Sequence, residues 1–153
     1  MAVEIRLARP EDGVALAANL RPEDLAEVQA YGWVHDIEAS MVDNIRRSLL
    51  CWTAEEGGDL VAVFGVAPLS MTGGIGSPWM LGTPLLERRS RVLVAQTRVY
   101  IPRMLRAFPF LFNHVHARNT RSVRWLARLG FTVQPAQPYG TAGELFHPFF
   151  MKA

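Results

Sequence analysis

Two histidines separated by one residue, His114 and His116, are well suited to proton transfer. They lie in the apolar stretch Phe110–Ala117, which is typical of a buried strand, and alternation along a strand puts both rings on one face. Because an imidazole titrates near neutral pH, either ring could act as a general base. The pair could also chelate a metal ion, although no third ligand is evident, or be simply packed or exposed. The only acids and tyrosines from Ser77 onward are Glu87, Glu144, Tyr100 and Tyr139.

The single cysteine, Cys51, excludes an internal disulfide. Its neighbours Leu50 and Trp52 are apolar, whereas a reactive thiolate needs an electropositive and partly exposed environment. The sequence therefore favours a buried, inert thiol over a catalytic nucleophile.

The charges are distributed unevenly along the chain. Up to Gly76 there are 12 acidic and 5 basic residues, a net −7, and from Ser77 onward there are 2 acidic and 11 basic residues, a net +9. Fifteen of the 16 basic residues are arginines, which suit bidentate recognition of phosphate or carboxylate. The basic half could serve a phosphorylated cofactor, DNA or an acidic protein partner, or it could pair with the acidic half inside one domain.

Length and composition indicate one soluble globular domain that spans residues 1–153, since half of the residues are hydrophobic and one fifth are charged. No apolar run approaches the ~20 residues that cross a bilayer, and the first residues lack a secretory pattern. Strands are predicted at Glu4–Arg9, Cys51–Glu55, Leu60–Val66, Trp79–Leu81, Phe110–Ala117, Phe131–Gln134 and Leu145–Met151. Helices are predicted from Pro10 to Leu20, from Arg21 to about Gly32, over Asp36–Leu50, over Thr83–Phe108 and from Asn119.

The helix Thr83–Phe108 should begin with Thr83 as N-cap and Pro84 in the first turn, and Pro102 should kink or divide it near its end. A strand, a helix and a second strand in the same sheet require a parallel, right-handed crossover. We therefore predict that Trp79–Leu81 and Phe110–Ala117 are adjacent and parallel in a mixed sheet of α/β class.

The segment Asn119–Phe131 carries marks of a short helix at both ends. Asn119 suits an N-cap, and Gly130 suits the left-handed position that follows a helix. The spacing of Asn119, Ser122, Trp125, Leu126, Gly130 and Phe131 resembles the last helical motif of the GNAT family, the acetyl-CoA-dependent N-acetyltransferases. The order of predicted elements resembles the GNAT fold across nearly the whole chain. The family often has a proton-donating tyrosine where this chain has Leu126.

The resemblance implies a site for acetyl-CoA along the strand Trp79–Leu81. Met80 and Leu81 would lie beside its pantetheine, Gly82 and Thr83 near its pyrophosphate, and Asn119 and Ser122 along its chain. The glycines of the usual pyrophosphate loop are missing there, and Gly74-Ile75-Gly76 precedes the strand, so we interpret it as a turn. The side chain of Arg88 could replace the lost backbone contacts, or it could belong to a solvated basic face. For the transferred protons the candidates are His116 and Tyr139.

Three segments are also similar to small proteins of short-tailed, double-stranded DNA phages and prophages grouped with internal virion protein A. They are Gly76–Thr83, Phe112–Asn119 and Arg124–Phe131. This resemblance implies a phage- or prophage-type protein of GNAT-like fold with weak or lost catalysis, in the host cytoplasm or the virion interior, with virion proteins or DNA as partners. The alternative is an active acetyl-CoA-dependent N-acetyltransferase acting on a small amine or a protein amine.

Overall fold

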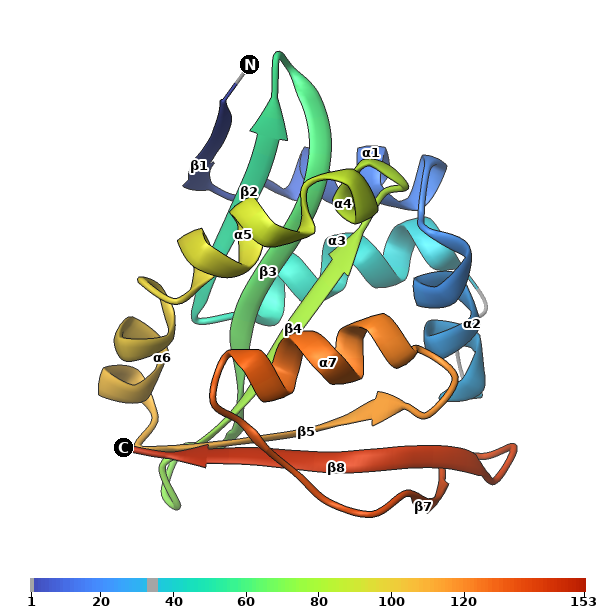
Figure 1. Cartoon of the computed structure of the whole chain (residues 1–153), viewed down its shortest axis with the longest axis vertical. Helices are drawn as coiled ribbons and strands as arrows, with labels where there is room; N and C mark the ends of the chain where they lie inside the picture. Colours follow the sequence, from blue (N-terminus) through green and yellow to red (C-terminus); the bar gives the residue numbers. More distant parts are fainter. Residues whose placement is uncertain (1, 33–35) are drawn as a thin grey trace.

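The computed structural model describes residues 2–32 and 36–153 and shows a single-domain α/β fold built on one mixed sheet (Figure 1). Its strands are β1 (Val3–Leu7), β2 (Leu50–Glu56), β3 (Asp59–Ser70), β4 (Ile75–Gly82), β5 (Phe110–His116), β6 (Thr132–Val133), β7 (Gln137–Tyr139) and β8 (Glu144–Lys152). Its helices are α1 (Pro10–Ala18), α2 (Pro22–Ala30), α3 (Ile37–Arg47), α4 (Leu85–Arg88), α5 (Ser90–Thr97), α6 (Ile101–Ala107) and α7 (Thr120–Arg128). The strand order is β1-β2-β3-β4-β5-β8-β6, and β7 pairs with β8.

The helices cover both faces of this sheet. In Figure 1, α4, α5 and α7 lie in front of the strands, and α1 and α3 lie behind them. Neighbouring residues of β2 show the two layers, because Cys51 packs with Leu16 and Met41 of the rear helices, whereas Trp52 packs with Ile101 and Phe108 on the front side. No helix in the described part of the chain is long and apolar enough to cross a membrane.

The predicted crossover is confirmed. Strands β4 and β5 are parallel neighbours, but only two residue pairs join them, Ile75 with Phe110 and Gly76 with Leu111. Strand β4 is longer than predicted, because Ile75–Pro78 pairs with β3 in spite of its glycine and proline. Gly74, with φ of +65°, lies in the turn before β4 as predicted, but Ile75 and Gly76 are the first two residues of the strand, so the interpretation of Gly74-Ile75-Gly76 as a turn is wrong for these two.

The helix predicted over Thr83–Phe108 is divided near Pro102, as predicted, but the continuous helix expected before Pro102 is wrong, because the structure divides that part into α4 and α5. Pro102 stands in the first turn of α6, where its missing N–H costs no hydrogen bond, so it starts a new helix. The N-cap assigned to Thr83 is also wrong. Its hydroxyl donates to the carbonyl of Leu60 at 2.7 Å and thereby ties the chain after β4 to β3.

The predicted helix after Asn119 is confirmed as α7, and its end follows the local signals. Gly130 has φ of +99°, and the N–H of Phe131 donates to the carbonyl of Leu126 while the Phe131 ring is buried. Asn119 occupies the N-cap position, but its side chain makes no capping hydrogen bond. The Asn119 side chain instead bonds to Arg21 and Asp24, beside the end of β4.

Candidate functional site

A cleft of about 620 Å³ opens where β4 and β5 separate beyond their two paired residues. The amide of Asn113 on β5 donates to the carbonyl of Pro78 at 2.8 Å and is the next link across the gap. The cleft is lined on one side by α2 and α3 and on the other by α5, α6 and α7, with Tyr31 and Met41 at one end and Trp125 and Leu126 at the other. It therefore passes through the sheet from one helical layer to the other.

The edge of β4 turns backbone groups toward this cleft. The carbonyl of Pro78 and the N–H of Gly82 both bond on that side, to Asn113 and to Asp24. Because strand residues alternate in direction, Met80 between them presents its N–H and C=O to the cleft as well. Leu81, the other predicted pantetheine contact, is 6% exposed and packs with Met41 and Val63 in the rear core.

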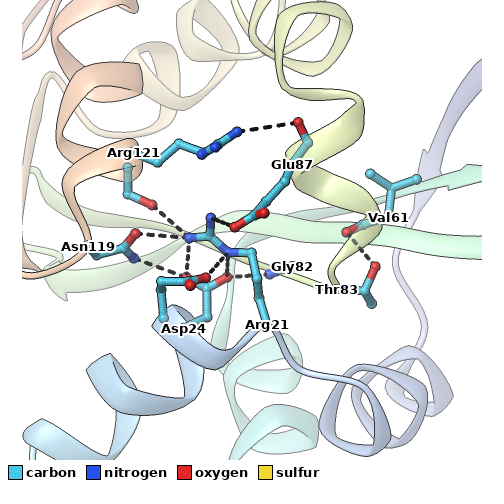
Figure 2. A network of polar contacts seen from close by, with 10 residues as sticks. Arg21, Asp24, Val61, Gly82, Thr83, Glu87, Asn119 and Arg121 are labelled. Atoms are coloured by element: carbon cyan, nitrogen blue, oxygen red, sulfur yellow. Dashed lines mark hydrogen bonds and ion pairs between the residues drawn. The ribbon is translucent and has the colours of Figure 1, made fainter.

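Arg21 and Asp24, at the start of α2, close the wide end of the gap (Figure 2). The N–H of Gly82 donates to Asp24 Oδ2 at 2.8 Å, and the carbonyl of Gly82 accepts from the backbone N–H of Arg21 at 2.8 Å. The Arg21 guanidinium donates twice to the Asp24 carboxylate, at 3.0 and 3.2 Å. The start of α2 is thereby bonded to the last residue of β4.

The same ion pair reaches across to α7. Asn119 accepts from Arg21 Nη2 at 2.9 Å and donates to Asp24 Oδ1 at 3.1 Å, and Ser122 Oγ accepts from Arg21 Nη2 at 3.3 Å. Arg21 is 1% exposed and lies 5.2 Å from the Trp125 ring centroid, close enough for a cation–π contact. We call Arg21, Asp24, Gly82, Asn119 and Ser122 the Arg21 network. Three of the predicted cofactor contacts, Gly82, Asn119 and Ser122, bond within this network.

The remaining predicted phosphate contacts offer few free donors. The N–H of Thr83 donates to the carbonyl of Val61 at 3.0 Å, and Pro84 has no N–H. Arg88 is exposed at the end of α4. A helix start binds phosphate through free backbone N–H groups, so this loop fits a pyrophosphate poorly as it stands.

The two predicted proton carriers have different contacts. His116 is 2% exposed, its Nε2 lies 2.9 Å from Glu144 Oε1, and it lines a separate hollow of about 220 Å³ beside Arg118. Tyr139 lies in β7, a strand that the sequence analysis did not predict, and stacks on His114, with ring centroids 3.8 Å apart. Of the two histidines it is His114 that lines the cleft, and burial lowers the pKa of its ring.

Glu27 on α2 is an acid at the cleft that the sequence did not single out. Burial, and to a smaller degree the nearby Asp24 carboxylate, raise the pKa of Glu27 to about 8, although its Oε1 accepts the backbone N–H of His116 at 2.7 Å. A carboxyl group with such a pKa can take up or release a proton near neutral pH. Its only sequence signal is its position three residues after Asp24, which places the two carboxyl groups on the same side of α2.

Two further side chains limit the chemistry of the cleft. Leu126, which stands where the GNAT resemblance implies a tyrosine, lines the cleft and has no hydroxyl, and Ser122, one turn earlier on α7, is bonded to Arg21. Burial raises the pKa of Cys51 to about 12, which agrees with the inert thiol predicted from the sequence. In the described chain, residues 2–32 and 36–153, no three potential ligands gather around a metal position.

The splayed parallel pair, the crossover and the helix after β5 define the fold of the GNAT acetyltransferases, as predicted. Ard1 from Thermoplasma volcanium is similar over 100% of this chain and 99% of its own, with a TM-score of 0.73 and 15% identity. The yncA protein of Salmonella typhimurium, solved with its cofactor acetyl-CoA, is similar over 99% and 94%, with a TM-score of 0.67 and 16% identity. The ribosomal-protein-S18-alanine N-acetyltransferase of Escherichia coli gives the same coverage and TM-score at 15% identity. No protein-family model and no curated protein sequence matches the chain.

Proposed function

We propose that this chain is a binding or assembly protein of phage or prophage type, which keeps the acetyltransferase fold while acetyl transfer is slow or lost. The phage setting, with the host cytoplasm or virion interior as location, rests on the three segments similar to the internal virion protein A group. The loss of catalysis rests on one structural observation, the Arg21 network.

The network uses the groups that a thioester cofactor would need. Asp24 accepts a hydrogen bond from the N–H of Gly82, and Arg21 donates hydrogen bonds to Asn119 and Ser122. The chain's own side chains therefore bridge the gap between β4 and α7. A ligand that entered there would have to break bonds to a buried ion pair, which is costly because each separated charge would lose its partner. The residues present therefore do not fit acetyl-CoA in this conformation.

Glu27 supports a second candidate, an active N-acetyltransferase that uses acetyl-CoA and acts on a small amine or a protein amine. With a pKa of about 8 in the cleft, its carboxyl group is suited to take a proton from an ammonium group near neutral pH. His116 is less suited to that role, because its ring lies against Glu144 outside the cleft.

Thermal melting with and without acetyl-CoA tests the proposal. A ligand at ~100 times its dissociation constant stabilises a protein by about 2.7 kcal/mol. For a chain of this length that corresponds to a rise in Tm of roughly 5–10 °C. We expect a change below ~1 °C at millimolar acetyl-CoA.

A thiol-release assay completes the test, with polyamines, aminoglycosides, amino acids and basic peptides as acceptors. We expect no release above the rate without protein. Turnover of ~1 per second or faster on any acceptor would refute the proposal. If Glu27→Gln then abolished that turnover, the second candidate would replace it.

A further inference from the structure

The arginines of the second half are largely left without acidic partners. Ten arginines follow Ser77, and nine of them are exposed. Among these ten arginines, only Arg89 forms an ion pair with a residue that the structure describes, Glu56 at 2.7 Å. The alternative in which the basic half pairs with the acidic half is therefore confirmed for Arg89 and not for the nine exposed arginines.

These arginines gather on one layer of the molecule. Arg98 Nη2 donates to the carbonyl of Arg128 at 2.8 Å, and Arg121 Nη1 lies 3.5 Å from the carbonyl of Glu87, so α7 is tied to α5 at one end and to α4 at the other. Figure 1 shows these helices together in front of the sheet. We call Arg91, Arg98, Arg121, Arg124 and Arg128 the arginine face.

Acids are concentrated on the other side of the sheet. Between Thr83 and Gly130 the sequence has one acid, Glu87, whereas α1, α2 and α3 carry Glu11, Glu23, Glu38 and Asp43, besides Asp12 and Asp24, which are paired with Arg6 and Arg21. The two helical layers therefore have opposite charge, and an anion approaching the protein is attracted to one of them and repelled by the other.

The spacing on α7 suits several phosphates at once. Arg121, Arg124 and Arg128 stand three and four residues apart and so share a side of the helix, where like charges destabilise it in the free protein. At ~1.5 Å per residue they extend over about 10 Å, more than one phosphate group covers. A polyanion would relieve this repulsion along the whole helix.

We infer that the arginine face binds the phosphate backbone of duplex nucleic acid without reading its sequence. The exposed side chains of α7 are Thr120, Arg121, Arg124, Ala127 and Arg128. The exposed large hydrophobic residues beside Arg91 and Arg98 are Val92 and Val99, so a protein partner would find no aromatic anchor on this face. Single strands are bound through stacked aromatic rings, and the only aromatic among the exposed large hydrophobic residues of the described chain is Tyr139 of β7. A duplex needs neither kind of contact, and it carries one negative charge per about 1.7 Å of its axis, a denser and more regular row of charge than a single strand or an acidic peptide offers to a row of arginines.

This inference goes beyond the proposed function. It depends on the surface of α5 and α7, and it holds whether or not the cleft transfers acetyl groups. The two ideas also have separate tests, because a melting or thiol-release assay reports on the cleft and a nucleic-acid titration reports on the surface.

The test is fluorescence anisotropy with a labelled 30-base-pair duplex of arbitrary sequence at about 50 mM salt. We expect micromolar binding that weakens steeply with salt, with a slope of log K against log salt near −4 for four or five phosphate contacts. Arg124→Ala with Arg128→Ala should weaken binding about tenfold or more and lower the slope by about 2. Arg9→Ala with Arg46→Ala removes the same charge from the acidic side and should leave the affinity within about twofold.

Competitors separate this surface from the alternatives. An unlabelled duplex should displace the label, whereas poly-glutamate of equal charge, a single strand of equal length or millimolar CoA should displace it poorly. No binding at low salt, equal losses in the two double variants, or equal displacement by any of these three competitors would overturn the inference. Circular dichroism of both double variants should match that of the parent, because all four side chains are exposed.

Discussion

Removing the Arg21 guanidinium should destabilise the protein far more than removing an exposed arginine. The side chains of Arg21 and Asp24 are 1% and 2% exposed, and Arg21 Nη2 lies 3.0 Å from Asp24 Oδ1. Arg21→Met keeps much of the volume but leaves the Asp24 carboxylate buried without a cation, which costs about 3–5 kcal/mol. For a chain of this length we expect a fall in Tm of roughly 6–20 °C.

A matched control and a double variant make this measurement specific. Arg47 and Asp43 on α3 also form an ion pair at 3.0 Å, but both side chains are about 60% exposed, so Arg47→Met should cost below ~1 kcal/mol. Asp24→Asn should also destabilise the protein. Combined with Arg21→Met it should cost ~1–3 kcal/mol less than the sum of the single variants, because the two residues act as a pair.

Differential scanning calorimetry of the four variants gives these differences directly. An Arg21→Met protein that melts within about 2 °C of the parent would refute the network as a buried structural element. Strict additivity of Arg21→Met and Asp24→Asn would also refute it. Either result would remove the reason for regarding the gap between β4 and α7 as closed, and with it the main support for slow catalysis.

Three further outcomes follow from other residues. Because the pKa of Glu27 is about 8 in the folded protein against an ordinary 4.5, the folded state holds this proton more tightly than the unfolded state. The contribution of Glu27 to the free energy of unfolding is therefore complete below pH 4.5 and is lost as the pH rises through 8. Glu27→Gln should therefore gain stability over the parent from pH 5 to pH 9, on the order of a few kcal/mol, and a constant difference in urea melts would contradict this. Cys51 should resist thiol reagents in the folded protein at pH 8 and react at once in denaturant, because its pKa is about 12; rapid labelling of the folded protein would disagree. Gly13→Ala should lower the unfolding free energy by about 1–3 kcal/mol, because the new Cβ would lie 2.6 Å from the backbone nitrogen of Val42, and an unchanged Tm would show that α1 can move away from α3.

Local signals in the sequence were sufficient for much of the fold. Helix α7 and its end at Gly130 were predictable because cap, periodicity and left-handed glycine all fall within a dozen residues. The β2–β3 hairpin was predictable from Gly57 and Gly58, which both have positive φ. The short strand β7 was not predicted, because Gln137–Tyr139 is exposed and gains its pairing only from β8.

The site was much less predictable than the fold. Arg21 and Asn119 are 98 residues apart in sequence, and no local pattern indicates that they meet. Charged residues are rarely buried, so Arg21 and Asp24 would ordinarily be placed on the surface of an amphipathic helix. Glu27 was missed for the same reason, since its raised pKa arises from burial at the cleft.

The short parallel pairing between β4 and β5, called the joint below, affects the order in which the molecule folds. Eight residue pairs connect β3 with β4 and seven connect β5 with β8, whereas two pairs connect β4 with β5. The ladders on either side of the joint can form independently, but the parallel pair forms only after the long crossover segment has been closed into a loop. The joint is therefore expected to form last and to separate first. Opening the cleft to a large ligand would then separate the same two strands, β4 and β5, that separate first in unfolding. A partner that bound both the β3–β4 ladder and the β5–β8 ladder would therefore slow unfolding.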